Sequence, residues 1–209
     1  MRFKILFFLI FCFLLNNCNT QIKKDSHQRI PNDFKINFLK KVLLDTVQLN
    51  FLPSKNHFVS NYPLLPPTSL YYLDSLSNKY KKAENQIDFI SQILNEEQPK
   101  FIESQIKRNK SLDLNKLSKF GIKILDVKKY SKEGISRDSI DEIVNEYYNK
   151  TDSYNLKNRS YLIVSKPIFN KEINLAYIRM LCGSSGASYL LEKGNNKWHI
   201  LKEFENWVE

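Results

Sequence analysis

The chain has 209 residues, of which 32 are lysine or arginine and 22 are aspartate or glutamate, so its formal net charge at pH 7 is +10. A basic balance of this size usually indicates a nucleic acid or an anionic membrane as partner. Lysine supplies 26 of the basic residues and arginine only six, whereas planar recognition of phosphate and guanine favours arginine. We therefore expect no nucleic-acid partner, and we expect the lysines to be scattered over a solvated surface.

The N-terminus has the pattern of an export signal. Arg2 and Lys4 give a basic start, and Ile5–Leu15 is an unbroken run of eleven apolar residues. This run is too short to span a bilayer, which takes about 20 residues in a helix. A short apolar run after a basic start is typical of a cleaved signal peptide.

The segment Leu15–Cys18, with the apolar run before it, resembles the cleavage site of bacterial lipoproteins, although asparagines occupy the two positions that usually hold small residues. In that family the signal is cleaved just before the cysteine, which carries a thioether-linked diacylglycerol. The resemblance implies that Cys18 is lipidated and that the protein is anchored in the cell envelope. Because Asn19 rather than aspartate follows the cysteine, it also implies the outer membrane. The alternative is a plain secretory signal cleaved near Asn17–Thr20, which would give a secreted, unlipidated protein.

The composition divides the chain into three parts. Residues 1–17 are the predicted signal peptide. Residues 18–30 are mostly polar and are predicted to form a flexible tether. Residues 31–209 are enough for a single domain with its own core, and we expect this domain to be α+β.

Apolar residues at helical spacing predict helices at residues 33–48, 84–95, 99–108 and 138–150. Asp33 is a candidate N-cap of the first helix. Four prolines between residues 53 and 67 predict an extended loop. Gly121 interrupts the helical pattern, and Ile122–Val127 follows it as a predicted strand. In the helix at 138–150 the expected buried residues are Ile140, Ile143, Val144 and Tyr147.

The last fifty residues contain four strand-like runs at Tyr161–Phe169, Leu175–Cys182, Ala187–Lys193 and Lys197–Val208. Turn segments of hairpin length separate them, which predicts an antiparallel meander of about four to five strands packed against the N-terminal helices. In the second run Ala176, Ile178, Met180 and Cys182 share one face, and we expect that face in the core. We also expect Trp198 to be buried against the helices.

The C-terminal part resembles the ends of uncharacterised exported proteins from AT-rich Gram-negative bacteria. The resemblance rests on Ser165–Asn170, Cys182-Gly183, Tyr189–Lys193, Lys197-Trp198 and Trp207-Val208. It implies a shared fold and carries no known activity with it.

Two side chains are candidates for chemistry. Cys182, before Gly183 at a strand end, is a candidate nucleophile, but its apolar neighbours favour an inert buried thiol. His199, which has Glu203 and Glu205 nearby in the sequence, is a candidate base. We interpret His199 as a half-exposed histidine of the sheet.

Other sites are not expected. The histidines His27, His57 and His199 have no metal-ligand spacing, and five glycines leave no phosphate-cradling loop. We therefore expect no catalytic, metal or cofactor site, and the favoured interpretation is a non-catalytic, lipid-anchored envelope protein. Its partner would be an envelope protein or a small ligand. The alternative is an envelope enzyme that uses Cys182, or His199 with Glu203 or Glu205.

Overall fold

The structure, a computed structural model, describes residues 29–44, 58–62, 83, 85–150, 161–183 and 185–208, without the side chains of 137 and 204–208. The predicted signal peptide and Cys18 lie outside these residues. The helices are α2 (Asn32–Leu44), α3 (Gln86–Ile93), α4 (Pro99–Asn109), the 3-10 helix η2 (Leu114–Phe120), α5 (Val127–Lys132) and α6 (Arg137–Lys150). The strands are β1 (Phe58–Ser60), β2 (Lys123–Leu125), β3 (Leu162–Val164), β4 (Ile168–Phe169), β5 (Leu175–Cys182), β6 (Ser185–Gly194) and β7 (Lys197–Val208).

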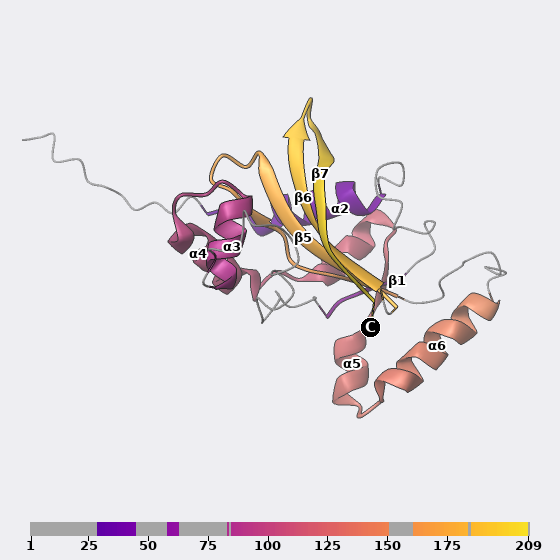
Figure 1. The fold of residues 1–209 in the computed structure, drawn as a ribbon. Helices are drawn as coiled ribbons and strands as arrows, with labels where there is room; N and C mark the ends of the chain where they lie inside the picture. Colours follow the sequence, from indigo (N-terminus) through magenta and orange to yellow (C-terminus); the bar gives the residue numbers. More distant parts are fainter. Residues whose placement is uncertain are drawn as a thin grey trace, which may run out of the picture.

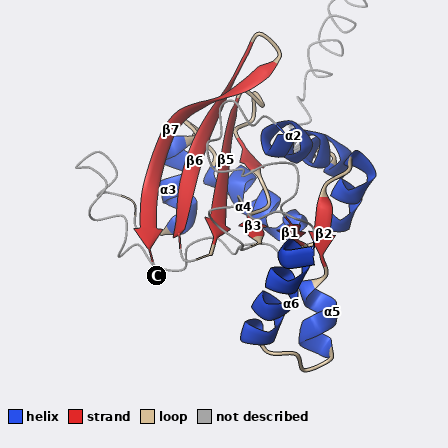
Figure 2. Cartoon of the chain, turned by 90° about the vertical axis from the view of Figure 1, so that its right-hand side faces the viewer, coloured by secondary structure: helices blue, strands red, loops and turns tan. Residues whose placement is uncertain are grey.

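These strands form one sheet with helices around it, as Figures 1 and 2 show. Their order is β2-β1-β3-β5-β6-β7, and β4 pairs with β5 beside β3. The strands from β3 to β7 pair antiparallel, which confirms the predicted C-terminal meander and the α+β class. The run Tyr161–Phe169 is divided into β3 and β4, and Pro167 between them has no N–H to donate to the ladder.

The other edge of the sheet was not predicted. Strand β1 pairs parallel with both β2 and β3, so the whole sheet is mixed. Strand β1 lies in the region predicted as a loop, and that prediction was wrong at residues 58–60. Three residues are too few to show an alternation, although Val59 is buried.

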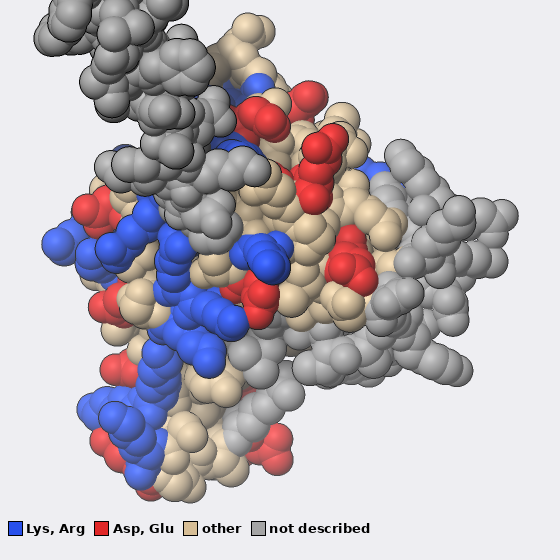
Figure 3. Space-filling model, turned by 90° about the vertical axis from the view of Figure 1, so that its left-hand side faces the viewer, with Lys and Arg blue, Asp and Glu red and all other residues tan. Residues whose placement is uncertain are grey.

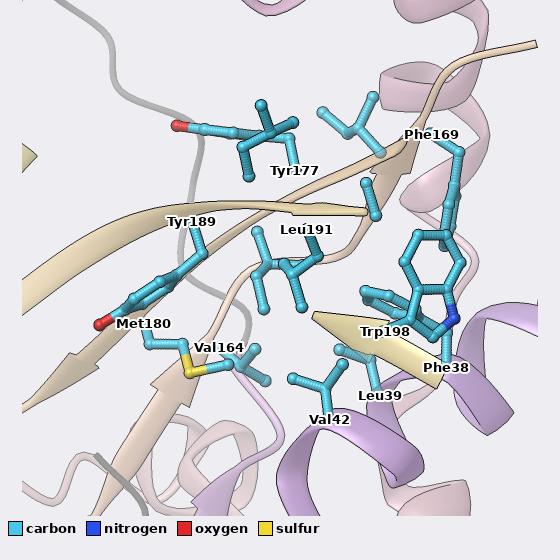
Figure 4. Close-up of a cluster of buried hydrophobic side chains, with 14 of the residues drawn as sticks. Phe38, Leu39, Val42, Val164, Phe169, Tyr177, Met180, Tyr189, Leu191 and Trp198 are labelled. Atoms are coloured by element: carbon cyan, nitrogen blue, oxygen red, sulfur yellow. The ribbon is translucent and has the colours of Figure 1, made fainter. Parts of the chain in front are cut away.

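One face of the sheet packs on α2. Figure 4 shows Phe38, Leu39 and Val42 directed toward Leu191 and Trp198. The Phe38 ring meets the Trp198 ring edge to face, with centroids 4.9 Å apart. Trp198 is 8% exposed, which confirms its predicted burial. The helix begins at Asn32, so Asp33 lies in its first turn and is not the predicted cap. Residues 45–48 of the predicted helix lie outside the described residues.

The opposite face of the sheet is also covered. Helix α3, whose predicted range was 84–95, places Phe89 against Tyr177 with ring centroids 6.5 Å apart. Helix α4 was predicted at 99–108 and begins at Pro99 as expected. From α4 the Gln105 side chain makes two hydrogen bonds to the backbone of Phe169, donating to its carbonyl at 2.6 Å and accepting from its N–H at 3.1 Å. These bonds fix α4 beside β4.

Helices α5 and α6 form a hairpin that projects beyond the β1–β2 end of the sheet, as Figures 1 and 2 show. A second apolar cluster lies at its base, with Ile140, Val144 and Tyr148 of α6 buried. The Tyr148 hydroxyl accepts a hydrogen bond from the Phe58 N–H at 3.3 Å, which links α6 to β1. The predicted inward position of Ile143 was wrong, since this side chain is 38% exposed.

The segment between η2 and α5 follows the prediction in part. Helix η2 ends at Phe120, and the φ of 78° at the next residue, Gly121, confirms the predicted break. Strand β2 lies within the predicted strand Ile122–Val127, but Val127 begins α5, which was not predicted. None of the helices in the described part of the chain is long and apolar enough to cross a membrane.

Candidate functional site

Cys182 ends β5, where it pairs with Leu162 of β3 and Ser185 of β6. It is a free cysteine, 8% exposed, and belongs to the main core together with Ile178 and Met180. Burial raises the pKa of its thiol, so the nucleophilic thiolate is disfavoured at neutral pH. The predicted inward orientation is confirmed.

We expect Cys182 in the folded protein to react with a maleimide only slowly at neutral pH and rapidly after denaturation in urea. The reason is that both the burial and the raised pKa of the thiol oppose attack. The measurement is the mass shift of the peptide that contains Cys182, with denatured protein as the control. Rapid labelling of the folded protein would restore Cys182 as a candidate nucleophile.

His199 and Glu203 lie on opposite faces of the sheet. The register of β6 and β7 pairs His199 with Glu192 and Glu203 with Tyr189. Paired residues share a face, whereas residues three positions apart in a strand, such as Tyr189 and Glu192, lie on opposite faces. Burial and the Glu203 carboxylate together raise the pKa of the Tyr189 hydroxyl, which agrees with this placement. The structure therefore does not bring His199 and Glu203 together, and the side chain of Glu205 lies outside the described residues.

The most unusual polar group in the described part of the chain is Lys35. It lies on the buried side of α2 and is only 2% exposed. Its Nζ donates a hydrogen bond to Asn109 Oδ1 at the last residue of α4. Asn109 Nδ2 in turn donates to the Pro167 carbonyl at 3.0 Å. This chain of contacts connects α2, α4 and the segment before β4.

The C-terminal end of α4 binds a second lysine. Lys166 Nζ donates to the carbonyl of Asn109 and, at 3.1 Å, to the carbonyl of Lys110. Cations are favoured there because the last carbonyls of a helix have no partners within the helix. Lys166 is half-buried, and desolvation lowers its pKa.

Among the described residues, the charged side chains that influence Lys35 are all positive. Desolvation, together with Arg108, Lys166 and Arg29, lowers its pKa from 10.5 to about 8. No described carboxylate forms an ion pair with Lys35, and the described ion pairs lie elsewhere on the surface. A buried charge of this kind is costly. A lysine whose pKa lies near neutrality can act as a nucleophile or base. The Lys35 amine is enclosed and bonded to Asn109, so a ligand outside the core can interact with its positive charge but cannot reach its lone pair.

On one side of the domain the lysine and arginine side chains are clustered rather than scattered. Lys166 lies near two clusters of basic residues that are separate in the sequence, 107–110 and 128–132. It bonds to the end of α4, and the charge of Lys128 in α5 lowers its pKa. Figure 3 shows lysine and arginine side chains in a band along one side of the molecule, reaching the projecting α5–α6 hairpin. The expectation of scattered lysines was therefore wrong for this side, because the fold brings separate clusters together.

The burial of Lys35 has a signal in the sequence. This lysine lies three residues before Phe38, four before Leu39 and seven before Val42, so it occupies the apolar stripe of its helix. A search for apolar residues at helical spacing does not detect this lysine. A charged residue at a stripe position is the pattern that would have indicated the buried amine.

No metal site is present in the part of the chain that the structure describes, since no three His, Cys, Asp or Glu side chains gather there as such a site would require. The chain as a whole matches no protein-family model, no curated protein and no solved structure.

Proposed function

We propose that this protein is a lipid-anchored component of the bacterial cell envelope, attached through Cys18, whose folded domain binds a partner rather than catalysing a reaction. The observation that carries the proposal is the N-terminal sequence: a basic start, the apolar run Ile5–Leu15 and a cysteine three positions after Leu15. Asn19 after the cysteine favours the outer membrane.

The described domain supports a binding role over an enzymatic one. Cys182 is enclosed in the core with a raised pKa. The sheet register places His199 and Glu203 on opposite faces. Catalysis needs a nucleophile or base within hydrogen-bond reach of its partner and of a substrate, and these candidates do not meet that requirement. A binding surface needs no such constellation.

Replacing Cys18 with alanine is expected to abolish the incorporation of labelled fatty acid when the full chain is expressed in a Gram-negative host. The reason is that a thioether to diacylglycerol requires the cysteine sulfur. The measurements are radiolabelled palmitate in the immunoprecipitated protein and its partition into a detergent phase. Cys182→Ala is the matched control, because it removes a different cysteine and is expected to leave labelling unchanged.

Two other results would contradict lipidation at Cys18. Equal incorporation in the Cys18→Ala variant and the unaltered protein would place any lipid elsewhere. A processed protein in the aqueous phase, without fatty acid, would support the secreted form cleaved near Asn17–Thr20.

A further inference from the structure

We propose that one side of the domain, formed by Arg29, Arg108, Lys110, Lys128 and Lys166, rests on the anionic headgroups of the membrane that holds Cys18. We call these five residues the basic face. The inference rests on the proposed lipid anchor and adds to it an orientation of the domain and a ligand class, the phosphate groups of anionic lipids.

Hydrogen bonds at the end of α4 and the nearby charge of α5 establish the basic face. Lys166 bonds to the carbonyls of Asn109 and Lys110 at the end of α4. Lys128, the second residue of α5, is close enough to Lys166 to lower its pKa. The band of lysine and arginine side chains in Figure 3 follows this side of the molecule.

The charge of the basic face is only partly offset. Arg29, Lys110 and Lys128 are exposed, whereas Arg108 and Lys166 are half-buried. Asp113 and Asp126 lie near Lys166 and Lys128 and offset part of the charge.

The buried charge of Lys35 adds to the positive potential of the basic face. It is close enough to Arg29, Arg108 and Lys166 for their charges to lower its pKa. It is buried and lacks a described carboxylate partner. Its interaction with the neighbouring charges is screened less than that between exposed charges, so it adds to the positive potential of this side.

The length of chain between Cys18 and the domain limits how far the domain can lie from the bilayer. Arg29 is the first described residue, and it belongs to the basic face because its charge reaches Lys35. Ten residues separate Cys18 from Arg29, and a segment of this length spans at most about 40 Å. A lipid on Cys18 would therefore keep the domain within about 40 Å of the bilayer, and the charge of the basic face would turn that side toward anionic headgroups.

The residue types favour lipid over nucleic acid. Three of the five residues are lysine, which binds phosphate as a point charge without a fixed geometry. Each lysine or arginine near an anionic bilayer adds to the electrostatic attraction, which falls off within a Debye length. An exported, anchored protein meets such a surface continuously.

The test measures which side of the domain approaches the bilayer. The detergent-extracted full chain carries a fluorophore at Ser111→Cys, beside the basic face, or at Lys197→Cys in the β6–β7 turn. It is reconstituted into vesicles of phosphatidylcholine alone or mixed with phosphatidylglycerol, each with an energy-accepting lipid. We expect several-fold stronger energy transfer from position 111 than from position 197 in the anionic vesicles, and a smaller difference in neutral vesicles or high salt.

Two triple variants, each labelled at Ser111→Cys, identify the charges responsible. The first, Arg29→Gln, Lys110→Gln and Lys128→Gln, should reduce transfer from position 111 to the level seen in neutral vesicles. The matched control, Lys171→Gln, Lys193→Gln and Lys197→Gln, removes the same charge from exposed positions in a turn and at the ends of β6 and β7, and should leave transfer unchanged.

The outcomes separate the two proposals. Equal transfer from positions 111 and 197 in anionic vesicles, or equal losses in both triple variants, would overturn the basic face while leaving the anchor intact. A protein without fatty acid that does not sediment with neutral vesicles would contradict the anchor itself. Loss of energy transfer from position 111 on addition of inorganic phosphate, but not of chloride at the same ionic strength, would indicate a discrete site for free phosphate and would overturn membrane docking.

Discussion

Replacing Trp198 with alanine is expected to lower the free energy of unfolding by about 3–5 kcal/mol, the range found for large aromatic residues removed from cores. Trp198 is 8% exposed and lies between the Phe38 ring, at 4.9 Å, and the Phe169 ring, at 5.8 Å. Its removal would leave a cavity between α2 and the sheet that these rings cannot fill without moving. Equilibrium unfolding in urea, followed by circular dichroism, measures the loss.

The matched control lies in the same strand. Leu201 is 55% exposed, and Leu201→Ala should change the free energy of unfolding by no more than about 0.5 kcal/mol. A loss below about 1 kcal/mol for Trp198→Ala would mean that β7 contributes little to the core, contrary to the described packing.

The C-terminal hairpins could be predicted because their signals are local. Strand β5 has the predicted bounds Leu175–Cys182, with turn residues on both sides. The turn between β6 and β7 places Asn195 and Asn196 at φ values of 48° and 61°. Asparagine tolerates this left-handed conformation better than most residues, and two such residues in succession suit a tight hairpin. Pattern and turn chemistry therefore agree over this region.

The other edge of the sheet could not be predicted because its pairing is not local. Strand β1 pairs Val59 with Ile124 of β2 and with Leu162 of β3, so each partner is more than sixty residues away in the sequence. Strands β1 and β2 have three residues each, too few for an alternation to be distinguished from chance. Helix α5, with six residues, is likewise too short to show a helical period.

One part of the candidate site could be predicted from the sequence, and the other part could not. The burial of Cys182 follows from a period of two along one strand, so it was predictable. The neighbours of Lys35 come from α4 and from the segment before β4. Arg108 and Lys166 are 58 positions apart in the sequence. Their meeting depends on the docking of Gln105 against β4, which no local pattern reports.

Replacing Lys35 with methionine is expected to remove a pH dependence of stability that the unaltered protein shows. The pKa of Lys35 is about 8 in the folded state, whereas that of a free lysine side chain is 10.5. Between these values the unfolded chain binds more protons than the folded one, so the free energy of unfolding rises with pH. The expected gain is about 1 kcal/mol between pH 7 and pH 9. Urea unfolding at several pH values measures it.

The difference between the two proteins isolates Lys35. The lowered pKa of Lys166 acts in the same direction as that of Lys35, whereas the raised pKa values of Cys182 and Tyr148 reduce stability as pH rises through and above 9. The Cys182 and Tyr148 contributions are common to the unaltered protein and Lys35→Met, so they cancel in the difference, which leaves the titration of Lys35 together with its repulsion of Lys166. At pH 7 the variant should be as stable as the unaltered protein or more so, because removal of an uncompensated buried charge offsets the lost bond to Asn109. Equal pH dependence in both proteins would show that Lys35 is solvated and would remove the buried charge beneath the basic face.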